Sequence, residues 1–274
     1  MEKSKILYVT QEINPFLIQS ELSEIVRTLS QGVHEQDKEI RIFMPRFGVI
    51  NERRHQLHEV IRLSGMNMIV NDYDHPLIIK VASIPQIRIQ VYFIDNEEYF
   101  KRKQVFNDES GKPFKDNDER SMFFCRGVLE TVKKLGWMPD IVHCHGWMTA
   151  LMPIYLKSVY QNDPHFANSK VIFSVYNNAL KGNFPKNFKE KLEFDEIPVQ
   201  ELGLTDKVTT KDLNILGVKW ADAITVGSES IQEEIQSEIE NSGKSTLEFT
   251  TEDNLIIAHQ DFYDKVLSEN GVLA

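Results

Sequence analysis

The chain has 274 residues and a formal net charge of −10. This acidic balance argues against a nucleic-acid-binding surface, which needs clustered Lys and Arg. No apolar run approaches the roughly 18–20 residues of a membrane span, and the basic start of the chain lacks the cleavage site of a signal peptide. The 2 cysteines, Cys125 and Cys144, make no disulfide framework and suit a reducing compartment. We therefore expect a cytoplasmic protein that binds neither nucleic acid nor membrane.

Strands and amphipathic helices alternate along most of the chain. Lys5–Val9 predicts the first strand, and the apolar spacing within Leu17–Val33 predicts a helix with one inward face. Further strands are predicted at Glu39–Pro45, Leu77–Ile84, Ile87–Asp95, Asp140–His145, Lys170–Tyr176 and, as the last one, Ala223–Ser228. Further helices are predicted at Asn117–Leu135, after a polar loop at Asn107–Asp118, and at Trp147–Tyr160. This alternation predicts an α/β fold, a doubly wound, mainly parallel Rossmann-like sheet with helices on both faces.

The sequence changes character after Ser228. A strongly charged helix is expected to end near Asn241–Gly243, and a last amphipathic helix is expected over about Glu252–Leu267. No second series of strands and helices follows them. We therefore expect one domain over residues 1–240 and a helical tail over residues 241–274, with no second domain.

Several stretches carry one family pattern, and they occur in that family's order. They are KILYVTQEINPF (Lys5–Phe16), IRIFMPRFG (Ile40–Gly48), VYFIDNEEYFKR (Val91–Arg102), DNDERSMFFCRGVLE (Asp116–Glu130), PDIVHCHGWMTALMPIYLK (Pro139–Lys157), VIFSVYNNALKGNFP (Val171–Pro185) and WADAITVGSESIQEEI (Trp220–Ile235). Together they resemble the N-terminal half of bacterial glycogen and starch synthases, which are retaining glucosyltransferases of the GT-B architecture.

The resemblance implies transfer of glucose from ADP-glucose or UDP-glucose to the non-reducing end of an α-1,4-glucan. In that family the donor nucleotide lies between two Rossmann-like domains, and the second domain supplies most of the nucleotide contacts. The family's final helix crosses back onto the N-terminal domain, and the tail helix expected here has the apolar face to do the same. No metal or other cofactor is expected.

The family's donor loop, Lys-Thr-Gly-Gly-Leu-Ala-Asp-Val, is altered in this sequence. When the preceding Pro-Phe pairs are aligned, the lysine falls on Ile18 and the two glycines fall on Ser20 and Glu21. The glycines let backbone N–H groups approach a diphosphate at a helix N-terminus, and the lysine neutralises its charge. Glu21 and Glu24 would stabilise the helix by up to about 1 kcal/mol each but would repel a diphosphate. With Ser20 as N-cap, the pattern favours a capped helix without a ligand.

Two further groups of cleft residues are altered. In the resemblance, an aspartate and a histidine that face the cleft fall on Gly146 and Met148, and the histidine that contacts the transferred glucose falls on the larger Tyr176. No intact catalytic set therefore remains. His143 and His145 are retained, and a His-x-His pair can bind a metal. Because no third ligand is evident, a hydrogen-bonded or structural role is favoured over a zinc site.

The substrate-binding candidates are the positions that keep the family pattern: His143, His145, Asn177, Gly182, Asp116, Asn117 and Arg120. For the last three, a capped helix start with an ion pair to Arg120 is an equally good interpretation. The aromatic residues of Leu180–Phe194 could line an acceptor groove, although aromatic residues in such a loop more often anchor the core. Cys144 is expected in the core rather than as a nucleophile.

A retained framework with altered cleft positions favours an inactive relative, a pseudo-transferase that binds α-glucan or regulates a true synthase. The alternative is an active glucosyltransferase completed by a separately encoded second domain or by an oligomer. A third class is a nucleotide-binding module unrelated to glucan. It has little support, because no Gly-x-Gly-x-x-Gly follows the first strand. The partners we consider are therefore α-glucan and a separate synthase or second domain.

Overall fold

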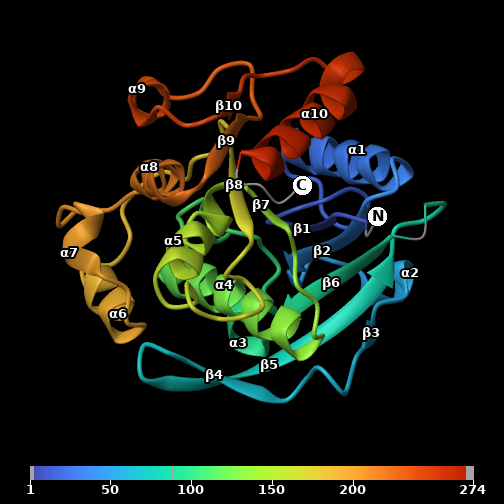
Figure 1. Ribbon diagram of the computed structural model, residues 1–274. Helices are drawn as coiled ribbons and strands as arrows, with labels where there is room; N and C mark the ends of the chain where they lie inside the picture. Colours follow the sequence, from blue (N-terminus) through green and yellow to red (C-terminus); the bar gives the residue numbers. More distant parts are fainter. Residues whose placement is uncertain (1–2, 88, 270–274) are drawn as a thin grey trace.

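The computed structural model describes residues 3–87 and 89–269 (Figure 1). The strands are β1 (Lys5–Thr10), β2 (Glu39–Pro45), β3 (His58–Glu59), β4 (Met66–Val70), β5 (Tyr73–Ser83), β6 (Gln90–Asp95), β7 (Ile141–His145), β8 (Lys170–Val175), β9 (Ala223–Val226) and β10 (Thr246–Leu247). In the described part of the chain they form one sheet of order β10-β9-β8-β7-β1-β2-β6-β5-β3, with β4 paired to β5. The ladder from β10 to β6 is parallel, and β3, β4 and β5 pair antiparallel.

Helices cover both faces of this sheet (Figure 1). They are α1 (Leu22–Glu35), α2 (Glu52–His55), α3 (Glu97–Phe100), α4 (Asn117–Lys134), η1 (Trp147–Thr149), α5 (Met152–Lys157), α6 (Phe188–Phe194), α7 (Val199–Leu202), α8 (Thr210–Trp220), α9 (Glu233–Ser242), η2 (Glu252–Asn254) and α10 (Leu255–Ser268). Helices α1 and α10 pack together on one face, and α4, α5 and α8 pack together on the other. Among the residues with a described position, no helix has the length and apolarity needed to cross a membrane.

The order of the strands reverses beside β1. From β1 the chain proceeds to β2 and β6 on one side, and it then returns to place β7, β8 and β9 on the other. The switch point therefore lies between β1 and β7. In open α/β sheets the crevice outside the carboxyl ends of the strands at such a point is the usual ligand site.

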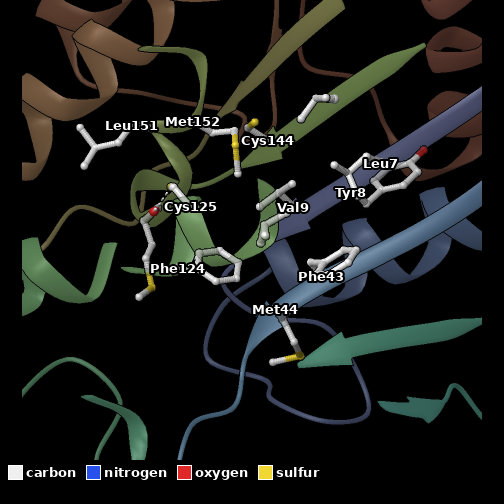
Figure 2. Packing of buried hydrophobic residues seen from close by; sticks show 14 of the residues in the cluster. Leu7, Tyr8, Val9, Phe43, Met44, Phe124, Cys125, Cys144, Leu151 and Met152 are labelled. Atoms are coloured by element: carbon white, nitrogen blue, oxygen red, sulfur yellow. Dashed lines mark hydrogen bonds between the residues drawn. The ribbon is translucent and has the colours of Figure 1, made fainter. Parts of the chain in front are cut away.

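The core lies on both faces of the central parallel strands. Successive side chains of a strand point to opposite faces, so β7 directs Cys144 toward α4 and its neighbours His143 and His145 toward α10. Figure 2 shows Cys144 of β7 and Cys125 of α4 among apolar side chains of β1, β2, α4 and the start of α5. Both cysteines are free and fully buried, and burial raises the pKa of each thiol. The expectation that Cys144 is a core residue is confirmed.

The predicted strands and the mainly parallel sheet are confirmed, with changes at the strand ends. The predicted Leu77–Ile84 strand begins earlier, at Tyr73, because it pairs with β4, which was not predicted. The predicted Ile87–Asp95 strand begins at Gln90, and its residue 88 lies outside the described residues. The prediction that Ala223–Ser228 is the last strand is wrong, because Thr246–Leu247 adds a short strand beside it.

Two predicted helices are shorter than expected. The first begins at Leu22 rather than Leu17, because the preceding residues form a loop. In this loop the backbone of Leu17 pairs with that of Ile13, and the Leu17 side chain is buried. The predicted Trp147–Tyr160 helix is divided into η1 and α5. Helix α8 was not predicted, although Thr209 and Asp212 form a capping box at its start and such a Thr-x-x-Asp pattern is visible in sequence.

The last helix of the chain docks on the domain. Gly32 of α1 allows a close approach, because a Cβ there would lie 2.3 Å from Cδ1 of Ile256 in α10. Lys38 donates to Asp264 at 2.7 Å. The buried face of α10 comprises Leu255, His259, Phe262, Tyr263, Val266 and Leu267. The helix expected over Glu252–Leu267 is therefore present as η2 and α10, and it covers the β1–β7 part of the sheet beside α1.

Candidate functional site

The loop between β1 and α1 folds around a buried carboxylate. Glu12 is 1% exposed, and its Oε2 accepts hydrogen bonds from the backbone N–H groups of Gln19 at 2.5 Å and Ser20 at 3.0 Å. The hydroxyl of Ser20 donates to Oε1 of Glu12 at 2.7 Å. Burial raises the pKa of Glu12, although these hydrogen bonds act against the shift. The expectation that Ser20 is the N-cap of α1 is wrong, because its side chain is committed to Glu12.

A second carboxylate connects α1 to the opposite side of the crevice. Glu21, at the start of α1, accepts a hydrogen bond from the hydroxyl of Ser228, which follows β9. The same hydroxyl accepts a hydrogen bond from the backbone N–H of Asn177 at 3.0 Å. Ile18 lies beside this bridge with 57% of its surface exposed. The loop aligned with the family's donor loop therefore presents an apolar residue and an acidic one, with no lysine.

The switch point between β1 and β7 is filled by a glutamine. Gly146, directly after β7, has φ +83° and ψ 168°, a conformation that only glycine adopts without strain. A Cβ there would lie 2.6 Å from Oε1 of Gln11 and 2.9 Å from Cδ1 of Leu22. Gln11 is 2% exposed, and its Oε1 accepts from the N–H of Met148 at 3.4 Å. The family's first strand resembles this one and leads into Ser-Glu-x-x-Pro-Phe, so in the resemblance Gln11 stands at the serine, Glu12 at the glutamate and Gly146 at the family's later aspartate. The larger side chain therefore follows β1 in this chain and follows β7 in the family pattern.

Gln11 is a site residue that the sequence analysis missed. The signal that could have found it is the pairing of two changes: a small family residue is replaced by a large one at Gln11, and a large residue is replaced by glycine at Gly146. The two changes are complementary because β1 and β7 are neighbours in the sheet, and the sequence alone does not show that pairing.

Tyr176 closes the crevice beside β8. Its side chain is buried, and its hydroxyl lies 2.9 Å from Nδ1 of His145. Its ring packs on Gly227, where a Cβ would lie 2.3 Å from Cε1 of the ring. The cavity bounded by Tyr176, Gly227 and His259 holds about 10 Å³. This volume is at the lower limit for one water molecule.

The two retained histidines belong to a buried polar network beneath α10. Nδ1 of His143 lies 2.7 Å from the hydroxyl of Tyr263, and its Nε2 lies 2.6 Å from the hydroxyl of Ser174. The hydroxyl of Tyr263 also lies 2.9 Å from that of Tyr8. The His143 and His145 rings have centroids 3.9 Å apart. These contacts link β1, β7 and β8 to the last helix.

The histidines of this network are neutral at pH 7. Burial lowers the pKa of His143 and His145 well below the usual value, and it lowers the pKa of His259 in α10 to about 4. Within residues 3–87 and 89–269, no group of three or more His, Cys, Asp or Glu side chains is arranged to hold a metal ion. The His-x-His pair contributes hydrogen bonds and ring packing to the domain.

The start of α4 holds the next candidate residues. Asp116 pairs with Arg102, at 2.8 Å from Nη1, so the expected ion pair with Arg120 is wrong. Arg120 is fully buried, and its Nη1 donates to Oδ1 of Asn117 at 2.6 Å. Its guanidinium is surrounded by the rings of Phe47, Phe100 and Phe114, with centroids at 5.4–5.5 Å. The expected Asp116 cap is also missing, because its side chain accepts no hydrogen bond from the helix.

The structure brings Asn117 close to the Gly182 loop. A cavity of about 20 Å³ is lined by Asn117, Gly182 and Phe184 together with Pro113, Phe114, Leu180, Lys181, Asn183 and Thr210. The aromatic residues of Leu180–Phe194 have different environments. Phe188 is buried, Phe184 packs against Phe188 with ring centroids 5.4 Å apart, and Phe194 is 48% exposed. Residues of α4 and of the loop after β8 thus share one small site, separate from the His143 network.

Together, the fold and the residues at the strand ends define a doubly wound α/β domain whose switch-point crevice is filled by its own side chains. A family model described as "Starch synthase catalytic domain" matches residues 5–248. The chain belongs to this family.

Curated glycogen synthases match the same part of the chain. That of Chlorobium limicola is 38% identical over 232 residues, covering 84% of this chain and 47% of the relative. That of Chlorobium chlorochromatii is 39% identical over 226 residues, covering 82% of this chain and 46% of the relative. The chain thus spans about half the length of the curated relatives it matches.

A solved structure shares the fold. The catalytic domain of starch synthase IV from Arabidopsis thaliana, solved with ADP and acarbose, superposes with a TM-score of 0.75 over 91% of this chain and 52% of that chain, at 16% identity. The predicted fold class and the resemblance to the N-terminal half of these synthases are both confirmed.

Proposed function

We propose that this protein acts in α-1,4-glucan metabolism as a glucan-binding or regulatory relative of glycogen synthase that does not itself transfer glucose. The observation that carries the proposal is the closed crevice at the strand ends. At that crevice the hydroxyl of Tyr176 lies 2.9 Å from Nδ1 of His145, and the Glu21 carboxylate accepts a hydrogen bond from Ser228. A sugar nucleotide would have to displace Tyr176 and Gln11, which are both buried.

The charges at the start of α1 support the same conclusion. The Glu21 carboxylate is held by Ser228 at the point where the family's donor loop has glycine. A carboxylate about 4 Å from a diphosphate costs roughly 1–4 kcal/mol, depending on the effective dielectric constant. Glu12 does not distinguish this chain in the same way, because the resemblance retains a glutamate at that position. The residues that distinguish this chain from the family pattern are therefore Ile18, Glu21 and Tyr176.

The alternative is an active glucosyltransferase completed by a second domain or by an oligomer. The observation that favours it is the length of the chain, which covers 47% of the Chlorobium limicola synthase. A partner could supply nucleotide contacts, but the side of the cleft formed by this chain would still lack the family's lysine and glycines. We therefore rank the inactive relative first.

One assay tests the proposal that the chain itself does not transfer glucose. The purified chain, with and without a separately produced glycogen synthase, is incubated with glycogen and either ADP-glucose or UDP-glucose, and nucleoside diphosphate release is measured. We expect no release by the chain alone, and we expect a melting-temperature shift with maltooligosaccharides but none with ADP-glucose. Turnover above background by the chain alone would refute the proposal.

A gain-of-function variant checks the alignment of the loop. Ile18→Lys combined with Ser20→Gly and Glu21→Gly restores the family pattern and removes the bridge to Ser228. We expect this triple variant to gain a melting-temperature shift with ADP-glucose. A folded triple variant without any such shift would contradict the assignment of this loop as the former donor site.

A further inference from the structure

A groove lies near the amino ends of the strands, whereas the closed crevice lies at their carboxyl ends. Its volume is about 480 Å³, and its walls come from the end of α5, the connection between α6 and α7, and the end of α8. The side chains that matter for binding are Lys157, Ser158, Gln161, Glu196, Glu201 and Trp220. The volume is within the range of small-molecule sites.

The position of this groove follows from the start of β8. Asp222, two residues after Trp220, accepts a hydrogen bond from the N–H of Val171 at 2.8 Å, and it pairs with Lys157 at 2.7 Å. Val171 is the second residue of β8, so the groove lies at the amino ends of the strands. Because the switch-point crevice lies at the carboxyl ends, a ligand could occupy the groove without approaching Tyr176 or Glu21.

The side chains of the groove disfavour anionic and wholly apolar ligands. Lys157 is already neutralised by Asp222. Among the described contacts, the exposed side chains of Glu196 and Glu201 have no hydrogen-bond or ion-pair partner. An anion would be repelled by these carboxylates, and a wholly apolar ligand would leave them desolvated and unpaired. A neutral ligand that carries many hydroxyl groups satisfies both carboxylates and the amide of Gln161.

Trp220 favours a ligand that also has an apolar face. It is half-buried at the end of α8, whereas Trp137 and Trp147 are 5% and 0% exposed. A tryptophan ring presents a broad apolar face with a negative quadrupole, and the C–H groups on one face of a hexose carry the complementary partial charge. We propose that the Trp220 groove is a binding site for a neutral oligosaccharide, and specifically for an α-1,4-glucan chain. The choice of α-glucan rests on the proposed function.

Tryptophan fluorescence tests the site directly. Maltoheptaose is titrated into the full chain, and binding to soluble glycogen is measured in parallel by isothermal titration calorimetry. Trp220 is the most exposed of the three tryptophans, so stacking of a sugar should produce a saturable change in emission. We expect Trp220→Ala and Glu201→Ala each to weaken maltoheptaose binding by about tenfold or more, equivalent to about 1.4 kcal/mol. Trp220→Phe should retain part of the affinity.

The control is Tyr73→Ala, which removes an aromatic side chain that is 69% exposed on β5, outside the groove. We expect this variant to bind maltoheptaose as the unchanged protein does. Glu201 is exposed, so Glu201→Ala keeps the test valid if Trp220→Ala does not fold. Wild-type glucan affinity in folded Trp220→Ala or Glu201→Ala would overturn the groove assignment and leave the proposed function standing. Donor turnover with normal maltoheptaose binding would overturn the proposed function alone.

Discussion

Replacing Gly146 by alanine tests whether Gln11 fills the switch point. Two effects add at this position. The backbone conformation, φ +83° and ψ 168°, costs a residue with a side chain about 1–3 kcal/mol. The new Cβ would also lie 2.6 Å from Oε1 of Gln11 and 2.9 Å from Cδ1 of Leu22, and such overpacking costs about 1–3 kcal/mol. We therefore expect Gly146→Ala to lower the free energy of unfolding by about 2–6 kcal/mol.

A second glycine with a similar φ provides a comparison without the steric contact. Gly65 has φ +84°, and a Cβ there would meet no atom within 4 Å. Gly65→Ala therefore reports the cost of a positive φ without a steric contact. Adding Gln11→Ser to Gly146→Ala removes the closest contact and should recover about 1 kcal/mol or more. Urea unfolding followed by circular dichroism gives all the free energies needed for this double-mutant cycle.

Two results would refute the reasoning. One is a Gly146→Ala variant that loses no more stability than Gly65→Ala, since the contact with Gln11 would then cost nothing. The other is additivity of Gln11→Ser and Gly146→Ala to within about 0.5 kcal/mol, the limit expected for independent sites. Either result would mean that the glutamine does not occupy the space above Gly146.

Further predictions concern the last helix and the network beneath it. Tyr263→Phe removes a hydroxyl that contacts both His143 and Tyr8, and we expect it to lower the free energy of unfolding by about 1–3 kcal/mol, whereas Tyr73→Phe at an exposed site should change it little. Because burial holds the pKa of His259 at about 4, its neutral form stabilises the fold fully above its unfolded pKa of about 6.5. This stabilisation is lost as the pH falls toward 4, by about 3 kcal/mol. The melting temperature should fall less between pH 7 and pH 4.5 in His259→Leu than in the unchanged protein. An equal fall in both proteins would contradict this prediction. Gly32→Ala should loosen α10, because its Cβ would lie 2.3 Å from Cδ1 of Ile256. Amide hydrogen exchange should then speed up in α10, and Ile256→Ala should restore protection if that contact is the cause.

The sequence predicts the strands better than the loops, for a physical reason. Glu39–Pro45 is predicted with its observed bounds because its second half, Ile42–Pro45, is an apolar run that is buried within the parallel part of the sheet and ends at a proline. The start of α1 is misplaced because the carboxylate of Glu12 holds the amides of Gln19 and Ser20 outside the helix. No periodic pattern of apolar residues records that contact.

The candidate site depends even more on contacts between distant parts of the chain. The resemblance identifies Ile18, Gly146 and Tyr176 as altered positions, and all three lie near the strand ends. It does not reveal that Gln11 takes the space above Gly146, 135 residues further along the chain. The structural interpretation of the helix start, as a cap with an ion pair to Arg120, also names the wrong arginine, because Arg102 and Arg120 are both near Asp116 in the sequence and only the fold decides between them.

The contact between Tyr8 and Tyr263 has a consequence for synthesis of the protein. These hydroxyls are 255 positions apart in the chain, and Tyr263 also closes the polar network of His143 in the centre of the sheet. On the ribosome the sheet from β1 to β9 can assemble before α10 has emerged, but its face beneath α10 then carries His143 and Tyr8 without their partner. Contacts of such long sequence separation form late and slow folding. A nascent chain stalled before residue 255 should therefore be the form that chaperones bind, and release should follow only when the last helix is complete.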